Sequence, residues 1–446
     1  MTVATQESQT TTGVTALAQA AVASGPAWLG NTRKAALAQL VELGLPTTRH
    51  EEWRFTSVAP IAQTAFTLPT YGVDGVTARD VARLAIPDLN ARTLVFVNGR
   101  YAPQLSDTAN LPAGVTVKPI TDLTDAERAI AEQHLTKHAR FDEDAFTALN
   151  TAMLDDGLFV HVARGTAVEP VLVMLHIATS SEAPMLINSR NLIVADPSSE
   201  VSVVEHYVAL DGGTYFTNAV TEIAADENAV VHHYLIERES EQAFNFSTLA
   251  IHLAKNADVA SHTLLFGGSL VRNNVYPVLD GSGAHCLVNG LYLASGTQHM
   301  DNHMRVEHAQ PHCDSRQFYK GILTDKARTV FSGRIVVRPG AQKTDAKQTN
   351  ANLILSDDAQ ANTKPQLEIY ADDVKCTHGA TIGQIDRDAV FYLQSRGISH
   401  EAAQALMVYS FAAESFDRIK HAPVRQFLEK LLIQKLPSGA VLDQVL

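Results

Sequence analysis

A short β-rich unit recurs three times, as VVEHYV at 203–208, VVHHYL at 230–235 and VASHTL at 259–264. Each unit carries a histidine, and His206, His233 and His262 follow one another at nearly constant spacing. Such recurrence indicates a solenoid, because each coil can bury its apolar face only against its neighbours. We therefore predict a parallel β-helix in which the three histidines occupy equivalent positions on successive coils.

The β-rich pattern extends from about Met153 to Gln384, with short apolar runs separated by Gly, Asp, Asn and Pro. A β-sandwich is the alternative, but a sandwich closes within ~100 residues and this region is more than twice as long. The first 150 residues are mostly helical in pattern, apart from TLVFVNGRY at 93–101, which alternates around an Asn-Gly turn. We predict three units, at 1–150, 151–385 and 386–446.

The last sixty residues return to a helical pattern with well-marked ends. Asp386 and Ser399 are predicted helix caps, and Pro423 suits the first turn of a third helix. That helix has an apolar stripe, formed by Val424, Phe427, Leu428, Leu431 and Leu432. The stripe must pack either on the solenoid or on another chain.

Composition limits the classes of function. The chain has 446 residues, 46% of them hydrophobic, and 35 Lys and Arg against 48 Asp and Glu give a formal net charge of -13. This charge repels phosphate backbones and anionic lipid, so we expect no nucleic acid and no membrane as partner. Three cysteines are too few for a disulfide framework, and the polar N-terminus does not resemble a secretory signal. We therefore expect a cytoplasmic protein with reduced thiols.

Nucleotide-binding loops, the serine hydrolase elbow, H-E-x-x-H and C-x-x-C are all absent from the sequence. The remaining reactive candidates are histidines and single cysteines. The stretch HMDNHMRVEHAQPHC at 299–313 brings together five candidate metal ligands, which are His299, His303, His308, His312 and Cys313. Its spacing matches no single ligand template, so a structural role for these side chains is the competing interpretation.

A second candidate is CTHGAT at 376–381. Cys376 and His378 stand two residues apart, so on a strand their side chains share a face within ~7 Å. The neighbouring Lys375 is expected to favour the thiolate of Cys376. This pair is the most reactive point that the sequence predicts, and an inert, buried cysteine is the alternative.

Long segments around this pair resemble the SufB/SufD family of iron-sulfur cluster assembly proteins. They are KGILTDKARTVFSGRIVV at 320–337, the run from AQKTDAKQTNANLIL to CTHGATIGQIDRDAVFYLQSRGIS at 341–399, and GLPTTRHEEWRFTSV at 44–58. The SufB branch typically has Glu where Gly379 stands here, together with additional cysteines in its core. The chain therefore resembles the SufD branch, and this departure argues against an independent scaffold activity.

The resemblance implies a right-handed parallel β-helix flanked by helical domains. It also implies assembly with SufB through the β-helix and with SufC, an ATPase that docks on the C-terminal helices. A transient iron-sulfur cluster would form at the SufB interface, with His378 as a ligand and Cys376 beside it. No resident cofactor is expected in the isolated chain, which is a candidate for homodimer formation.

Two hypotheses follow. The first is a non-catalytic assembly subunit, whose ligands would lie on an exposed edge that faces a partner. The second is a β-solenoid metalloenzyme, whose 299–313 histidine cluster would converge in a cleft with an open coordination position. The placement of His378, His303 and His308 distinguishes them.

Overall fold

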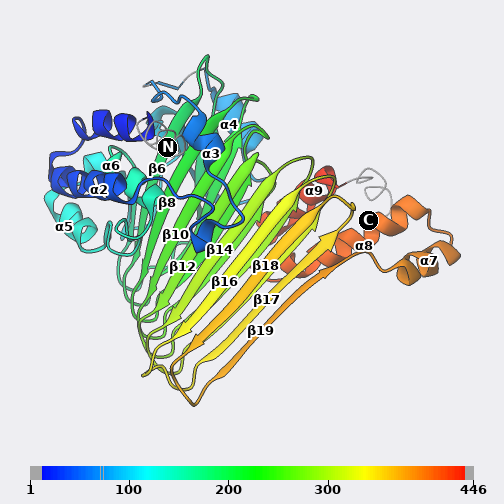
Figure 1. The fold of residues 1–446 in the computed structure, drawn as a ribbon. Helices are drawn as coiled ribbons and strands as arrows, with labels where there is room; N and C mark the ends of the chain where they lie inside the picture. The colour runs from blue at the N-terminus through cyan, green and yellow to red at the C-terminus, as the bar shows by residue number, and fades with distance from the viewer. Residues whose placement is uncertain (1–12, 71, 74, 437–446) are drawn as a thin grey trace.

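The computed structural model describes residues 13–70, 72–73 and 75–436, and its centre is a parallel β-solenoid (Figure 1). Two sheets form its walls, and the chain crosses from one to the other on every coil. Sheet A has nine strands in the order β18-β16-β14-β12-β10-β8-β6-β4-β3, and sheet B has ten in the order β19-β17-β15-β13-β11-β9-β7-β5-β1-β2. The predicted fold class, a mainly β solenoid with helices at both ends of the chain, is confirmed.

The strands are β1 (Ala91–Val97), β2 (Arg100–Tyr101), β3 (Val115–Pro119), β4 (Leu158–Val162), β5 (Val171–Ala178), β6 (Met185–Ala195), β7 (Glu200–Ala209), β8 (Tyr215–Ala225), β9 (Val230–Arg238), β10 (Phe244–Leu253), β11 (Asp258–Leu265), β12 (Leu270–Leu279), β13 (His285–Ala294), β14 (His299–His308), β15 (Asp314–Leu323), β16 (Arg328–Val337), β17 (Asp345–Ile354), β18 (Gln360–Ile369) and β19 (Lys375–Gly383). The helices are η1 (Ala27–Leu29), α2 (Gly30–Leu43), η2 (Glu51–Trp53), α3 (Ala59–Gln63), α4 (Ala78–Leu84), η3 (Pro103–Leu105), η4 (Ile120–Asp122), α5 (Asp125–His134), α6 (Ala145–Ala152), α7 (Arg387–Ser395), α8 (His400–Phe416) and α9 (Ala422–Lys435). Strands β1 and β3, which lie inside the predicted N-terminal unit, pair with β5 and β4 of the solenoid.

Stacked turns hold the coils in register. At one corner of each coil a residue adopts a positive φ, and its N–H donates to a carbonyl of the next coil, as from Asn228 to Lys255 at 3.0 Å. Asn and Gly tolerate this backbone conformation best. The corner residues are Ser198, Asn228, Asn256, Gly283, His312 and Lys343.

The recurrence of His206, His233 and His262 correctly predicted that their strands are neighbours, but it predicted the wrong register between them. Strands β7, β9 and β11 are adjacent in sheet B, yet His206 pairs with Ile236, and His233 pairs with Ser261. The expectation of equivalent positions was therefore wrong. A shift of an odd number of residues turns a side chain to the opposite face of a sheet. His233 therefore points into the solenoid, whereas His206 and His262 lie beneath the C-terminal helices.

The helices cover the outer faces of the two sheets. In Figure 1 the blue and cyan N-terminal helices lie against the early strands, and the orange and red C-terminal helices lie on the other side. Buried side chains of α2 and α6 pack with aromatic residues of β8 and β10 in sheet A. Those of α8 and α9 pack with apolar residues of sheet B. No helix in the described part of the chain is long and apolar enough to span a membrane.

The predicted helix ends at the C-terminus are confirmed. Asp386 caps α7, Ser399 caps α8 by accepting from the N–H of Ala402, and Pro423 lies in the first turn of α9. Such caps each stabilise a helix by about 1 kcal/mol. The helical region is therefore defined locally, while its position on sheet B depends on packing.

Candidate functional site at the open end of the solenoid

Cys376 and His378 lie on β19, the last strand of sheet B. They pair in register with Ala346 and Gln348 of β17, whose side chains are buried in the solenoid interior. The predicted sharing of one face is therefore correct, and that face looks into the last coil. Cys376 is half-buried and His378 is exposed.

The electrostatic environment of Cys376 differs from the prediction. Burial, with a smaller contribution from the Asp345 carboxylate, raises the pKa of the Cys376 thiol. Lys375 does not offset this effect, because adjacent side chains on a strand point to opposite faces. Cys376 is therefore protonated at neutral pH, and it would ligate a metal by losing its proton as the metal binds.

Among the described residues, no element caps the last coil. None of the side chains of β18 and β19 is fully buried, whereas those of the preceding coils mostly are. Each of the two strands has a hydrogen-bonded neighbour on one side, and no other described strand pairs with its outer edge. An exposed edge of this kind is a template for pairing with another chain. In Figure 1 β18, β17 and β19 form the yellow and orange rim of the solenoid.

The 299–313 histidines point to different places. His308 faces the interior, where its Nε2 lies 2.8 Å from the hydroxyl of Ser315. His312 is exposed at a solenoid corner, with φ of 63° and its N–H bonded to Gln342. Cys313 is buried, and its thiol donates to the carbonyl of Gly281 at 3.2 Å. Alternation along β14 and the turn that follows separates these side chains.

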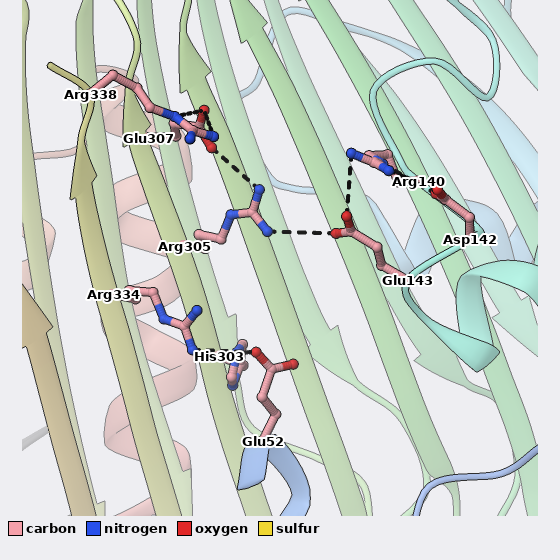
Figure 2. A network of polar contacts seen from close by, with 9 residues as sticks. All are labelled: Glu52, Arg140, Asp142, Glu143, His303, Arg305, Glu307, Arg334 and Arg338. Carbon is pink, nitrogen blue, oxygen red and sulfur yellow. Dashed lines mark hydrogen bonds and ion pairs between the residues drawn. The ribbon is translucent and has the colours of Figure 1, made fainter. Parts of the chain in front are cut away.

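His299 and His303 lie on the outer face of sheet A, beneath the segment 51–56. His299 Nε2 is 2.9 Å from the Thr56 hydroxyl, and His303 Nε2 is 3.8 Å from a Glu52 carboxylate oxygen. Burial lowers the pKa of His303 well below its usual value. Glu52 also lies 3.5 Å from Arg334, so this carboxylate links the N-terminal segment to β16, while the neutral His303 of β14 lies beside it (Figure 2).

A second link between the N-terminal region and sheet A lies nearby. Glu143, just before α6, contacts Arg305 of β14 at 3.6 Å and Arg140 at 3.3 Å. Arg305 and Arg338 in turn share the carboxylate of Glu307, at 3.3 and 2.7 Å (Figure 2). These partly exposed ion pairs join the N-terminal region to the solenoid and contribute about 0–1 kcal/mol each, so the stretch around His303 has a structural role.

Within residues 13–70, 72–73 and 75–436, no three His, Cys, Asp or Glu side chains are placed to hold a metal ion together. The predicted five-ligand cluster is therefore not assembled. The metalloenzyme hypothesis required convergent ligands in a cleft, and the structure does not favour it. The alternative arrangement, with His378 on an exposed strand, is the one observed.

Comparison with known proteins decides the family. The model of the SUF system FeS cluster assembly SufBD core domain matches residues 176–411, and that of the SufBD protein N-terminal region matches residues 14–173. The chain belongs to the SufB/SufD family. It is 35% identical to the iron-sulfur cluster assembly protein SufD of Escherichia coli over 91% of this chain and 92% of the relative. An iron-sulfur cluster assembly SufBD family protein of Synechocystis is 33% identical over 92% of each chain, and SufD of Bacillus subtilis is 26% identical over 92% of this chain and 94% of the relative.

In this SufB/SufD protein the predicted partner-binding stripe of α9 is covered by the chain itself. Val424, Leu428, Leu431 and Leu432 are buried against sheet B. The ring of the half-buried Phe427 has its centroid 5.8 Å from that of the His206 ring and 5.5 Å from the guanidinium carbon of Arg238. The stripe therefore packs on the solenoid, which was one of the two options that the sequence left open. Large exposed apolar side chains occur instead on α7, at Phe391 (72%) and Tyr392 (58%).

Polar side chains line the interior next to the candidate site, and the sequence analysis missed them. Gln348, Asn350 and Asn352 all point inward from β17, where apolar residues are usual. Gln348 donates to Gln317 at 2.7 Å, and Asn350 donates to the hydroxyl of Tyr292 at 3.1 Å. The signal was present in the alternation of AKQTNAN at 346–352, because its inward positions after Ala346 are amides. The SufB/SufD protein thus has a polar interior behind Cys376 and His378.

Proposed function

We propose that this SufB/SufD family protein is the SufD-type subunit of an assembly with SufB and SufC, on which iron-sulfur clusters are built. The observation that carries the proposal is the uncapped last coil, whose exposed strand β19 presents His378 and Cys376 on its inward face. A partner that paired with the edges of β18 and β19 would cover both side chains. We assign this edge to SufB, and to a second copy of this chain when SufB is absent.

The chemistry of the pair suits a shared cluster. Thiolate and imidazole are established ligands of iron-sulfur centres. His378 and Cys376 supply at most two ligands, so the partner must contribute the others. The cluster is then cargo that forms between two chains and leaves for an acceptor protein, and the chain itself acts as a scaffold rather than as an enzyme.

ATP hydrolysis is assigned to SufC, because the sequence lacks a phosphate-binding loop. We place the SufC contact on α7, whose Phe391 and Tyr392 side chains are exposed. Beside them, a cavity of about 790 Å³ separates α7 and α8 from the corners of the last coils and is lined in part by Val390 and Val408. Exposed aromatic residues next to a recess are typical of protein contact sites.

The test uses the complex reconstituted from this chain, SufB and SufC under anaerobic conditions. We expect His378→Ala to preserve the melting temperature and the assembly of the complex, because the exposed imidazole buries little surface. Iron and acid-labile sulfide per complex should fall, since one of a small set of ligands is lost. His312→Ala is the matched control, because His312 is also exposed but lies at a corner of the solenoid, and it should load normally.

The competing interpretation gives His378 only a structural hydrogen bond. It predicts a loss of stability of about 1 kcal/mol with full cluster loading. Full loading of the His378→Ala complex would therefore refute the ligand assignment. Cys376→Ser separates the two residues, because a normal iron content in that variant would leave His378 as the ligand from this chain.

A further inference from the structure

Two imidazoles face each other at the junction between α5 and sheet A. His134 is the last residue of α5, and its Nδ1 lies 3.3 Å from Nε2 of His138. The two rings are stacked with centroids 5.6 Å apart, and His138 stacks in turn on His252 of β10 at 5.1 Å. The three side chains are half-buried, so water and small ions can reach them.

The distance between the facing nitrogens is informative. It lies at the long end of a hydrogen bond from one ring N–H to the nitrogen of the other ring. Two nitrogens bound to one tetrahedral zinc ion at ~2.0–2.1 Å lie about 3.3–3.4 Å apart. The separation of His134 and His138 therefore equals that of two ligands of one metal ion.

The surroundings favour a cation. An imidazole binds a metal ion through the lone pair of a ring nitrogen, and the facing nitrogens of His134 and His138 can each supply one. The carboxylates of Glu222, Asp226 and Asp196 attract positive charge at His134, although the buried Arg190 pairs with Glu222 and offsets part of this attraction. Imidazole nitrogens are donors that zinc and related ions select.

The backbone around the pair is held in place before any ion binds. Glu222 of β8 accepts hydrogen bonds from the N–H groups of Thr136 at 2.7 Å, His138 at 2.9 Å and Ala139 at 3.1 Å. The same carboxylate pairs with Arg190 at 2.5 Å in a fully buried contact. His252 is fixed as well, because its Nε2 lies 3.1 Å from Asp280. The loop from α5 to α6 thus presents both nitrogens from a rigid base.

We propose that His134 and His138 form a binding site for a divalent transition-metal ion of the zinc class, which fastens the end of α5 to the loop on sheet A. The chain supplies two ligands and water completes the shell, because no third His, Cys, Asp or Glu side chain of the described residues joins them. This site is separate from Cys376 and His378 and does not depend on the proposed function.

The experiment is a calorimetric titration of the full-length, tag-free chain with Zn²⁺ after removal of metals by a chelator. We expect His134→Gln and His138→Gln each to weaken binding at least ten-fold, since loss of an outer-shell partner alone costs 10–100-fold, roughly. His161→Gln is the matched control, because His161 is likewise half-buried on sheet A but faces the Asp196 carboxylate at 3.0 Å and no second imidazole. It should retain the affinity of the wild type within about two-fold.

Co²⁺ absorption provides an independent measurement. An ion held by imidazole and water gives weak visible bands, whereas a thiolate ligand such as Cys376 adds an intense near-ultraviolet band. We expect the visible bands alone, and their loss in the double variant His134→Gln/His138→Gln. Equal Zn²⁺ affinity in the wild type and the folded double variant would overturn the proposal, as would visible Co²⁺ bands that persist unchanged in that variant.

Discussion

Truncation of Leu428 tests whether the α9 stripe belongs to the core of this chain. Leu428 is fully buried among apolar side chains of sheet B. Replacing a buried leucine by alanine costs 2–5 kcal/mol, roughly, through lost burial and the cavity that remains. We therefore expect Leu428→Ala to destabilise the docked C-terminal helices by about 3 kcal/mol.

Amide hydrogen exchange is the suitable assay, because it resolves local opening of α9 from unfolding of the solenoid. A change of 3 kcal/mol corresponds to an increase of about 100-fold in the exchange rate of protected α9 amides. Phe391→Ala is the control, since its side chain is 72% exposed and surface substitutions usually change stability by less than ~0.5 kcal/mol. Unchanged α9 exchange in Leu428→Ala, combined with lost SufC binding, would refute the assignment of the stripe to the core.

Two further predictions concern the solenoid interior. Burial alone would raise the pKa of Glu205, but the hydrogen bond and charge of His233 outweigh this effect and bring the pKa to about 2. The carboxylate therefore stabilises the fold at any pH above its unfolded pKa of about 4.3, and this stability is lost as the pH falls toward 2. Glu205→Gln should lower the free energy of unfolding by about 3 kcal/mol at pH 7 and by progressively less at acid pH. Urea unfolding that shows the same difference between variant and wild type across this pH range would contradict the ion pair. At Gly321 an added Cβ would lie 2.2 Å from the ring of Tyr292, so Gly321→Ala should lower the free energy of unfolding by roughly 1–3 kcal/mol. Gly340→Ala should not lower it, because no atom lies within 4 Å of a Cβ added at Gly340. Equal urea midpoints for the two variants would exclude this packing.

Local patterns predicted the parts of this structure that local physics controls. The Asn-Gly turn between β1 and β2 forms as predicted, with positive φ at Asn98 and Gly99, because a two-residue hairpin requires that conformation. The caps at Asp386 and Ser399 depend only on neighbouring N–H groups. Strand recurrence likewise revealed the solenoid, because each coil repeats one short pattern.

Long-range placement could not be obtained in this way. His233 points inward because Glu205 and Ser261 flank it on adjacent coils, and no spacing in the sequence fixes that register. The segment around Trp53 provides another case, since the guanidinium of Arg272 lies 3.8 Å from its ring across more than two hundred residues. Contacts of this kind are set by the fold as a whole, so the density of histidines at 299–313 appeared more like a metal site than it is.

At the site of Cys376 and His378, too, the local pattern predicted one property and the long-range contacts decided another. Alternation along a strand was sufficient to place the two side chains on one face. It did not show that burial and the Asp345 carboxylate raise the pKa of the thiol, because that effect depends on β17, the neighbouring strand.

The two ends of the solenoid differ, and this difference gives the molecule a direction of disassembly. The first coils are covered by the N-terminal helices and by the short antiparallel strands β2 and β3, while β18 and β19 have a neighbour on one side only. In a stack of coils, stability is the sum of interactions between nearest neighbours, so the terminal coil is the one that frays first. Unfolding should therefore start at β19 and proceed coil by coil toward β4. A chain bound at the free end would stabilise the terminal coil and so protect every coil behind it from unfolding.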